Sequence, residues 1–254
     1  MSRTLNLIDA GWTSVRSAAA GGRRSDALAR VSKLLARPDL PAAVAAEAHR
    51  LAGDLLTDAE RYSEARRHLR AAAALAPACA RTFYLWGLAC ERDPHGCDRR
   101  AALRFRAASR LEPRNPLYRA AFGRAAVRCD RVKAGVRELL AAAAAAPGDF
   151  PVIRVVADGL LEAGRLDGAR RVLDRAKFRC RNAAAAGELA ALAERVRFES
   201  ARTGQREATR HRQDAEFARD GGRVVLPFVR VAGGGVVRRD VVSRPRPHFP
   251  RLLN

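Results

Sequence analysis

Residues 81–113 read RTFYLWGLACERDPHGCDRRAALRFRAASRLEP, and this stretch decides the fold of the chain. It contains Gly87 in its first half, and Ala101 and Phe105, four residues apart, in its second half. Small residues allow two helices to pack closely, because the distance between helix axes depends on the side chains at the contact. The proline at the end of the stretch stops a helix, since it lacks an N–H and clashes with the preceding turn. The stretch therefore predicts a helical hairpin.

The same unit, a small residue followed by a proline about 24 residues later, occurs three times along the chain. A fourth copy starts at Ala157 and has Arg181 where the proline would fall. A generic alanine-rich helical bundle is the alternative, but such a bundle has no reason to keep one period. The distance from glycine to proline is 24 residues for Gly53 and Pro77, 26 for Gly87 and Pro113, and 24 for Gly123 and Pro147.

These units resemble the tetratricopeptide repeat (TPR), a 34-residue helical hairpin with aromatic, Leu-Gly, Ala-x3-Phe and Pro positions. The resemblance covers roughly residues 46–181. It implies an all-α, right-handed solenoid of about four to six hairpins. The valines, glycines and prolines after Gly222 predict a short irregular or β C-terminal tail behind it. The residues that match best are Phe83, Trp86, Gly87, Ala101, Phe105 and Pro113.

Four parts are expected along the chain. Residues 1–40 form a degenerate N-terminal hairpin that caps the stack, because a terminal repeat must cover an otherwise exposed face. Residues 41–181 hold the four clearer repeats, and residues 182–220 form C-terminal capping and extension helices. Residues 221–254 form a basic tail rich in proline and glycine.

The sequence predicts two changes of structure in the C-terminal part of the chain. We expect Gly204 to interrupt the helix that begins near residue 183, leaving residues 205–219 as an exposed helical extension. Residues 221–254 contain seven arginines and one acidic residue. This tail is either free in solution or packs its apolar residues into the chain's own groove or onto a partner.

The charge of the chain is strongly positive, with 48 basic and 27 acidic residues and a net charge of +21. Such an excess predicts attraction to acidic proteins, RNA or anionic lipid, although a merely solvated basic surface is the alternative. No apolar run approaches the length that a membrane-spanning helix needs. The five cysteines have no regular spacing, which favours a reduced, cytoplasmic protein over a disulfide framework. A transit peptide at the N-terminus is the alternative localisation.

In the family that the chain resembles, the first helix of each hairpin lines a concave groove that holds partner peptides. Because the arginine fork pairs with both oxygens of a carboxylate or phosphate, we predict that this groove binds an acidic or amphipathic peptide segment. The alternative is that its arginines are solvated and partly neutralised by nearby acids such as Asp58 and Glu91. The groove positions are Arg50, Asp54, Arg81, Tyr84, Leu88, Arg124, Arg128, Arg154 and Asp158, and Glu162 extends the row.

No pattern of catalytic residues stands out, so we expect no enzyme activity, no cofactor and no metal. The best metal candidate, Cys90 with His95 and Cys97, lacks a fourth ligand and the usual CxxC spacing. We expect His49 to be a packing residue and His68 to be isolated.

The sequence therefore predicts a non-enzymatic scaffold or adaptor that binds another protein. An alternative is nucleic-acid binding through the arginine-rich surface, although Tyr84 is almost the only groove aromatic able to stack on a base. A scaffold subunit of an enzyme complex fits the sequence equally well. The identity of the partner and the oligomeric state are left open.

Overall fold

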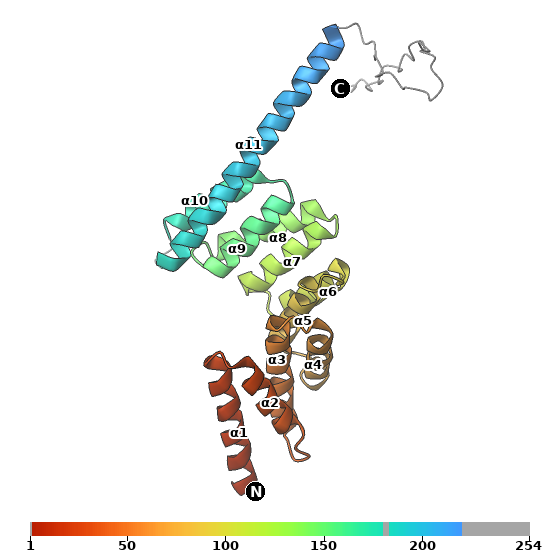
Figure 1. The fold of residues 1–254 in the computed structure, drawn as a ribbon, viewed down its shortest axis with the longest axis vertical. Helices are drawn as coiled ribbons and strands as arrows, with labels where there is room; N and C mark the ends of the chain where they lie inside the picture. Colours follow the sequence, from red (N-terminus) through yellow and green to blue (C-terminus); the bar gives the residue numbers. More distant parts are fainter. Residues whose placement is uncertain (1, 180–182, 220–254) are drawn as a thin grey trace, which may run out of the picture. The chain divides into compact units, whose positions relative to one another are not determined.

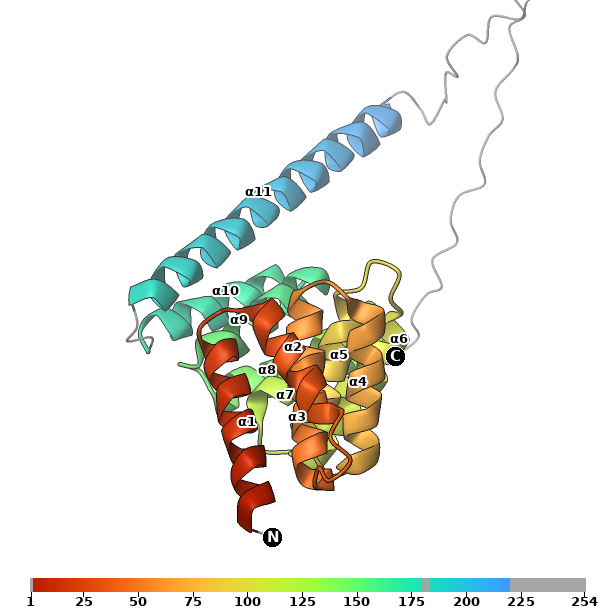
Figure 2. The same cartoon turned by 60° about the horizontal axis from the view of Figure 1, so that its bottom comes forward.

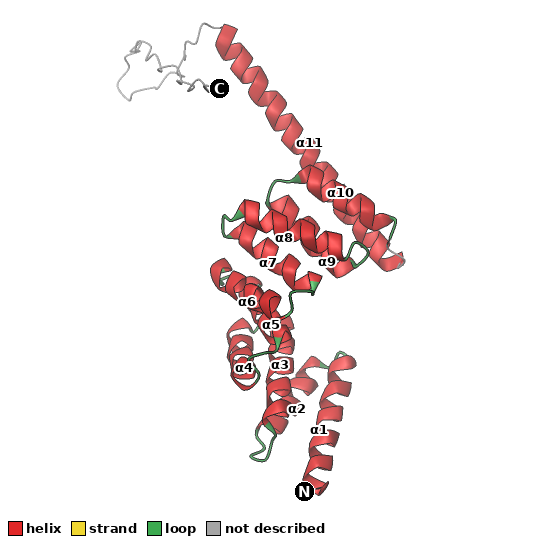
Figure 3. Ribbon diagram, turned by 180° about the vertical axis from the view of Figure 1, so that it is seen from behind, coloured by secondary structure: helices red, strands yellow, loops and turns green. Residues whose placement is uncertain are grey.

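The computed structural model describes residues 2–179 and 183–219, and Figure 3 shows helices and loops but no strand in this part of the chain. The predicted all-α class is therefore confirmed. The expected irregular or β tail, residues 221–254, lies outside the described residues. The helices, labelled in Figure 1, are α1 Ser2–Ala20, α2 Arg24–Leu35, α3 Ala42–Asp58, α4 Tyr62–Leu75, α5 Ala80–Glu91, α6 Asp98–Leu111, α7 Pro116–Arg128, α8 Val132–Ala145, α9 Phe150–Glu162, α10 Leu166–Lys177 and α11 Ala183–Arg219.

Consecutive helices from α1 to α10 pair into five hairpins, and each hairpin contacts the next one along the chain. Figure 2 shows one such pair, α3 and α4, side by side. Short turns with left-handed backbone join the helices of four hairpins, and the turn between α5 and α6 is longer. The left-handed residues are Gly22 (φ 71°), Glu60 (φ 60°), Asp130 (φ 61°) and Gly164 (φ 67°).

The recurring small residues lie at the closest contacts between paired helices. A Cβ atom on Gly53 would collide with the side chain of Leu69, and one on Gly87 would collide with Phe105. A Cβ on Gly123 would lie 3.0 Å from the carbonyl oxygen of Gly135. The repeat register read from the sequence therefore corresponds to real helix–helix contacts.

One buried side chain from the second helix of each of the last four hairpins packs at the contact with the first helix. Each is at most 1% exposed, and each occupies the same place in its repeat. Burying a large apolar side chain contributes about 1.5–3 kcal/mol, so these positions supply much of the core energy of a hairpin. They are Leu69, Phe105, Leu139 and Leu173.

Helix α11 differs from its prediction, because it continues through Gly204 without a break. A single glycine inside a helix costs about 1 kcal/mol, which its helix-forming neighbours offset. The hydroxyls of Thr203 and Thr209 donate hydrogen bonds to the carbonyls of Glu199 and Gln205, four residues earlier, which satisfies both hydroxyls within the helix.

The chain divides into two compact units, Met1–Val196 and Arg197–Asn254. The first part of α11 belongs to the first unit, where Leu189, Leu192 and Val196 pack into the core formed with α9 and α10. The four-part division expected from the sequence stays a prediction. No helix in the described residues is long and apolar enough to cross a membrane.

Candidate partner-binding surface

All nine predicted groove residues lie on the first helices of their hairpins, α3, α5, α7 and α9. We call the surface that these residues form the first-helix face. Its residues include three groups: an ion-pair cluster, an aromatic cluster, and three arginines near the aromatic cluster, Arg50, Arg81 and Arg154. Leu88 of α5 belongs to none of these groups, because it is half-buried and packs against the hydrophobic core.

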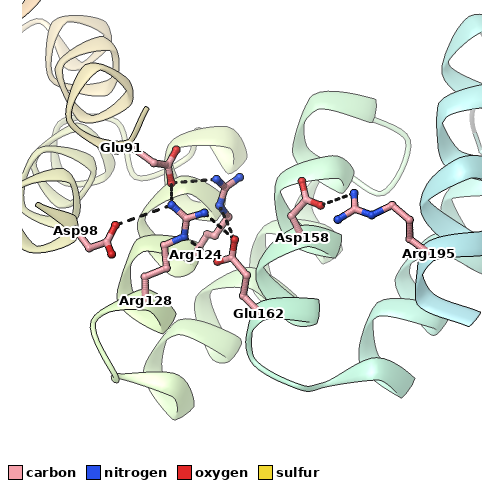
Figure 4. Close-up of polar contacts among 7 residues, drawn as sticks. All are labelled: Glu91, Asp98, Arg124, Arg128, Asp158, Glu162 and Arg195. Atoms are coloured by element: carbon pink, nitrogen blue, oxygen red, sulfur yellow. Dashed lines mark hydrogen bonds and ion pairs between the residues drawn. The ribbon is translucent and has the colours of Figure 1, made fainter. Parts of the chain in front are cut away.

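An ion-pair cluster joins α5, α7 and α9, and Figure 4 shows its two arginines between two glutamates. Glu91 Oε1 lies 3.2 Å from Arg124 Nη2 and 3.4 Å from Arg128 Nη1. Glu162 Oε1 lies 2.9 Å from Arg128 Nη2 and 3.6 Å from Arg124 Nε. Asp98 approaches Arg128 at 3.9 Å. The positive charges of both arginines are therefore matched inside the protein.

Glu91 is the most enclosed member of this cluster, with a side chain only 10% exposed. Burial raises the pKa of its carboxyl group, while the charges of Arg124 and Arg128 act in the opposite direction. The ion pairs therefore hold a carboxylate in a place where an unpaired one would be costly.

Further ion pairs link successive first helices in the same way. Asp158 on α9 accepts a hydrogen bond from Arg195 on α11 at 3.2 Å, as Figure 4 also shows. Asp58 on α3 lies 3.0 Å from Arg92. The predicted row of groove charges is thus partly used to join neighbouring repeats.

An aromatic cluster occupies the first-helix face between α5 and α7. The ring of Tyr84 lies 5.0 Å from the ring of Tyr118 and 5.8 Å from that of Phe105, centroid to centroid. Burial raises the pKa of both tyrosines. The positive charge of Arg154 lowers the pKa of Tyr84, and the positive charge of Arg81 lowers that of Tyr118, so both oppose the effect of burial.

The third group consists of arginines near this aromatic cluster. Arg81 and Arg154 are exposed and make no ion pair with another described residue. Arg50 pairs only with Glu47, at 3.2 Å, within the described part of the chain. Asp54 makes no ion pair among the same residues, and burial, together with the charge of Asp58, raises its pKa.

The structure gives no support to a metal site in the described residues, where no three potential ligands come together. Cys90 is buried and Cys97 is exposed, and the turn that carries His95 is held by other contacts. An ion pair joins Arg66 of α4 to Asp93, whose second oxygen accepts a hydrogen bond from the backbone N–H of His95 at 3.0 Å.

The expectation that His68 is isolated is wrong. Its Nδ1 lies 2.9 Å from Nδ1 of His49, across the hairpin formed by α3 and α4. His49 lies where α3 packs against α4, as expected for a packing residue. The residue that it meets on α4 is His68.

Sequence reasoning missed three residues that contact the predicted groove residues: Tyr118 of α7, Asp98 of α6 and Arg195 of α11. A periodic signal for one of them is present, because an acid followed 37 residues later by an arginine occurs at Glu91 and Arg128 and again at Asp158 and Arg195. Tyr118 carries no such signal.

Comparison of the sequence with protein-family models and with curated proteins gave no match. Solved structures do match. TTC0263, a thermophilic TPR protein of Thermus thermophilus, aligns with a TM-score of 0.58 and 16% identity, over 73% of this chain and 98% of that one.

Two further structures align over similar lengths. The MamA protein gives a TM-score of 0.54 at 16% identity, covering 70% of this chain and 93% of that one. YrrB, a TPR protein, gives 0.51 at 18% identity, covering 68% and 87%. At these identities the likeness concerns the fold, and the fold is the one that the repeat register predicted. This chain therefore has a TPR-like fold.

Proposed function

We propose that this chain is a non-enzymatic interaction scaffold that binds an acidic segment of a partner protein on its first-helix face. Its TPR fold supports the proposal, and YrrB is described as a TPR protein with an unusual peptide-binding site. The observation that carries the proposal is the unequal pairing of the arginines on this face.

Arg124 and Arg128 are already matched by Glu91 and Glu162, so a partner carboxylate would have to displace an existing ion pair to reach them. They would therefore join repeats rather than bind a ligand. This division revises the role predicted for both arginines and favours the part of the face formed by the N-terminal halves of α5 and α9.

Arg81 and Arg154 remain available for a ligand, because neither has an acidic partner among the described residues. Tyr84 lies near them and is only half-buried, so part of its ring is open to a ligand, whereas Tyr118, which contacts this ring, is buried in the core. An extended segment with acidic and apolar residues would place carboxylates on the two guanidinium groups and an apolar side chain on the ring of Tyr84. Guanidinium–carboxylate hydrogen bonds are among the strongest that a surface can make.

Asp54 limits which segments fit this site. Its carboxyl group is half-buried and lies near Arg50 and Arg81, whose charges act on it. A partner carboxylate placed beside Asp54 would be repelled. The partner segment should therefore approach Arg81 from the side of Tyr84 and Arg154.

The test is a fluorescence-anisotropy titration with a short labelled peptide of alternating glutamate and leucine. We expect the double variant R81A/R154A to weaken binding about tenfold or more, since each charged hydrogen bond contributes about 1.5–3 kcal/mol. The control R106A/R171A removes the same charge from exposed positions on α6 and α10 and should bind normally. Equal losses in both variants would reduce the interaction to general charge attraction, and the proposal would fail.

A further inference from the structure

The second compact unit begins within α11, and between Glu199 and Ala215 the only apolar side chains of this helix are alanines, so this stretch has no large apolar face. Every residue from 201 to 215 is exposed. A helix of this kind gains nothing from packing, whereas most helices in proteins depend on a buried apolar face for their stability. Its surface is therefore available to a polar partner.

Three arginines form a row along this stretch: Arg202, Arg206 and Arg210. Side chains four residues apart lie on the same helix face, about 6 Å apart along the axis. Arg202 makes an ion pair with Glu199 at 3.4 Å. Arg206 and Arg210 make none with a described residue.

The row is unfavourable for the helix by itself, because like charges four residues apart destabilise it. Two nearby acidic residues offset this repulsion only in part. Glu207 lies three residues before Arg210, on a neighbouring part of the helix surface, but makes no ion pair with it. Asp214 continues the row one turn beyond Arg210 but makes no ion pair with it. A polyanion lying along the three arginines would remove the repulsion.

The composition of the second unit agrees with this picture. Residues 197–254 contain 13 arginines and no lysine against 6 acidic residues, a net charge of 13 − 6 = +7. Arginine binds phosphate oxygens in pairs through its planar fork, whereas lysine acts as a point charge. The positive charge of this unit is therefore carried by arginine, the side chain best able to bind phosphate groups.

We propose that the row Arg202–Arg206–Arg210 binds the phosphate backbone of a nucleic acid, without reading its bases. This surface is separate from the proposed peptide site and does not depend on it. A lipid surface fits less well, because a helix that binds a membrane buries an apolar face, which this stretch lacks. A helical protein partner would likewise need an apolar seam.

The proposal is tested by anisotropy titrations of the full chain with a labelled single-stranded RNA and a labelled DNA duplex over a range of salt concentrations. The triple variant R202Q/R206Q/R210Q keeps good helix formers in the row. We expect at least a tenfold loss of affinity and a slope of log K against log salt that is shallower by about 2–3, since each neutralised phosphate contributes about 0.7–0.9.

A matched control removes the same charge elsewhere, with R106Q/R110Q/R171Q at exposed positions of the first unit. This variant should retain its affinity and slope. A circular dichroism spectrum equal to that of the parent chain establishes that the triple variant is folded. Binding of the alternating glutamate–leucine peptide should be unchanged in it, which separates this surface from the peptide site.

Two results would overturn the proposal. One is an equal loss in the row variant and in the control, which would mean that net charge alone drives binding. The other is binding to phosphatidylserine vesicles or polyglutamate without binding to RNA or DNA. A preference between RNA and DNA identifies the nucleic acid, while equal binding supports recognition of the shared phosphodiester backbone.

Discussion

Gly87 on α5 lies directly against the ring of Phe105 on α6. A Cβ atom at position 87 would be 2.5 Å from Cε1 of this ring, and Phe105 is fully buried. Because protein interiors are close-packed, the ring could yield to an added methyl group only by displacing its neighbours. The closest approach of these two helices therefore requires a residue without a side chain at position 87.

The first prediction is that Gly87→Ala destabilises the chain although alanine is the better helix former. Overpacking costs about 1–3 kcal/mol, which exceeds the gain of about 1 kcal/mol in helix propensity. Gly187→Ala in α11 is the matched control, because a Cβ there meets nothing within 4 Å. Urea unfolding should show a loss for the first variant and a gain of about 0.5–1 kcal/mol for the second. A gain in both would contradict the register.

The second prediction concerns the start of α7, where Asn115 accepts hydrogen bonds from the backbone N–H groups of Leu117 and Tyr118. Loss of such a cap costs about 1 kcal/mol, so Asn115→Ala should lower the unfolding free energy by that amount. Asp149 holds the same position before α9 but makes no capping hydrogen bond. Asp149→Ala should therefore cost less, and equal losses would mean that the side-chain cap does not matter.

The fold could be predicted because its main constraint is local and periodic. A small residue is needed wherever two paired helices come closest, and Gly53, Gly87 and Gly123 fill this position in successive repeats. The constraint can therefore be recognised from the sequence alone. Gly204 was misjudged for the opposite reason: a single glycine costs little, and its neighbours decide whether the helix continues.

The site was harder to predict, since sequence position alone does not decide which arginines find acidic partners. Arg92 and Arg128 hold the same place in successive repeats, five residues after the recurring glycine, yet Arg92 reaches one aspartate and Arg128 reaches two glutamates on neighbouring repeats. That outcome depends on side-chain reach between helices. The contact between His49 and His68 depends in the same way on the pairing of α3 with α4.

The third prediction compares two ion pairs that differ in exposure. The Glu91 side chain is 10% exposed and serves two arginines, whereas the Asp58 side chain is 44% exposed and pairs with Arg92. Removing one partner of an enclosed pair leaves uncompensated charge, so Glu91→Gln should cost about 2 kcal/mol. Asp58→Asn should cost less than about 1 kcal/mol.

Urea unfolding at low and high salt measures both effects. The loss from Asp58→Asn should shrink as salt screens the exposed pair, while the loss from Glu91→Gln should largely persist. Equal losses with equal salt dependence would show that the cluster around Arg124 behaves as an ordinary surface pair.

The fourth prediction follows from the contact between His49 and His68. Burial lowers the pKa of both imidazoles below the ordinary value of 6.5, and the neighbouring His68 lowers that of His49 further. The charge of Glu64 acts in the opposite direction on His68. The unfolded chain therefore takes up protons at a higher pH than the folded chain, so stability is full above about pH 6.5 and is lost as the pH falls.

The measurement is the urea midpoint of unfolding between about pH 7.5 and pH 5, across the range in which these imidazoles titrate. His49→Phe removes one titrating group and the repulsion between two imidazolium ions, so its stability should fall less steeply as the pH is lowered. His211→Gln is the control, because His211 is exposed on α11, and its profile should follow that of the parent chain. If His49→Phe and the parent chain lose stability in parallel, the pH response arises elsewhere, and the contact between the two rings has no part in it.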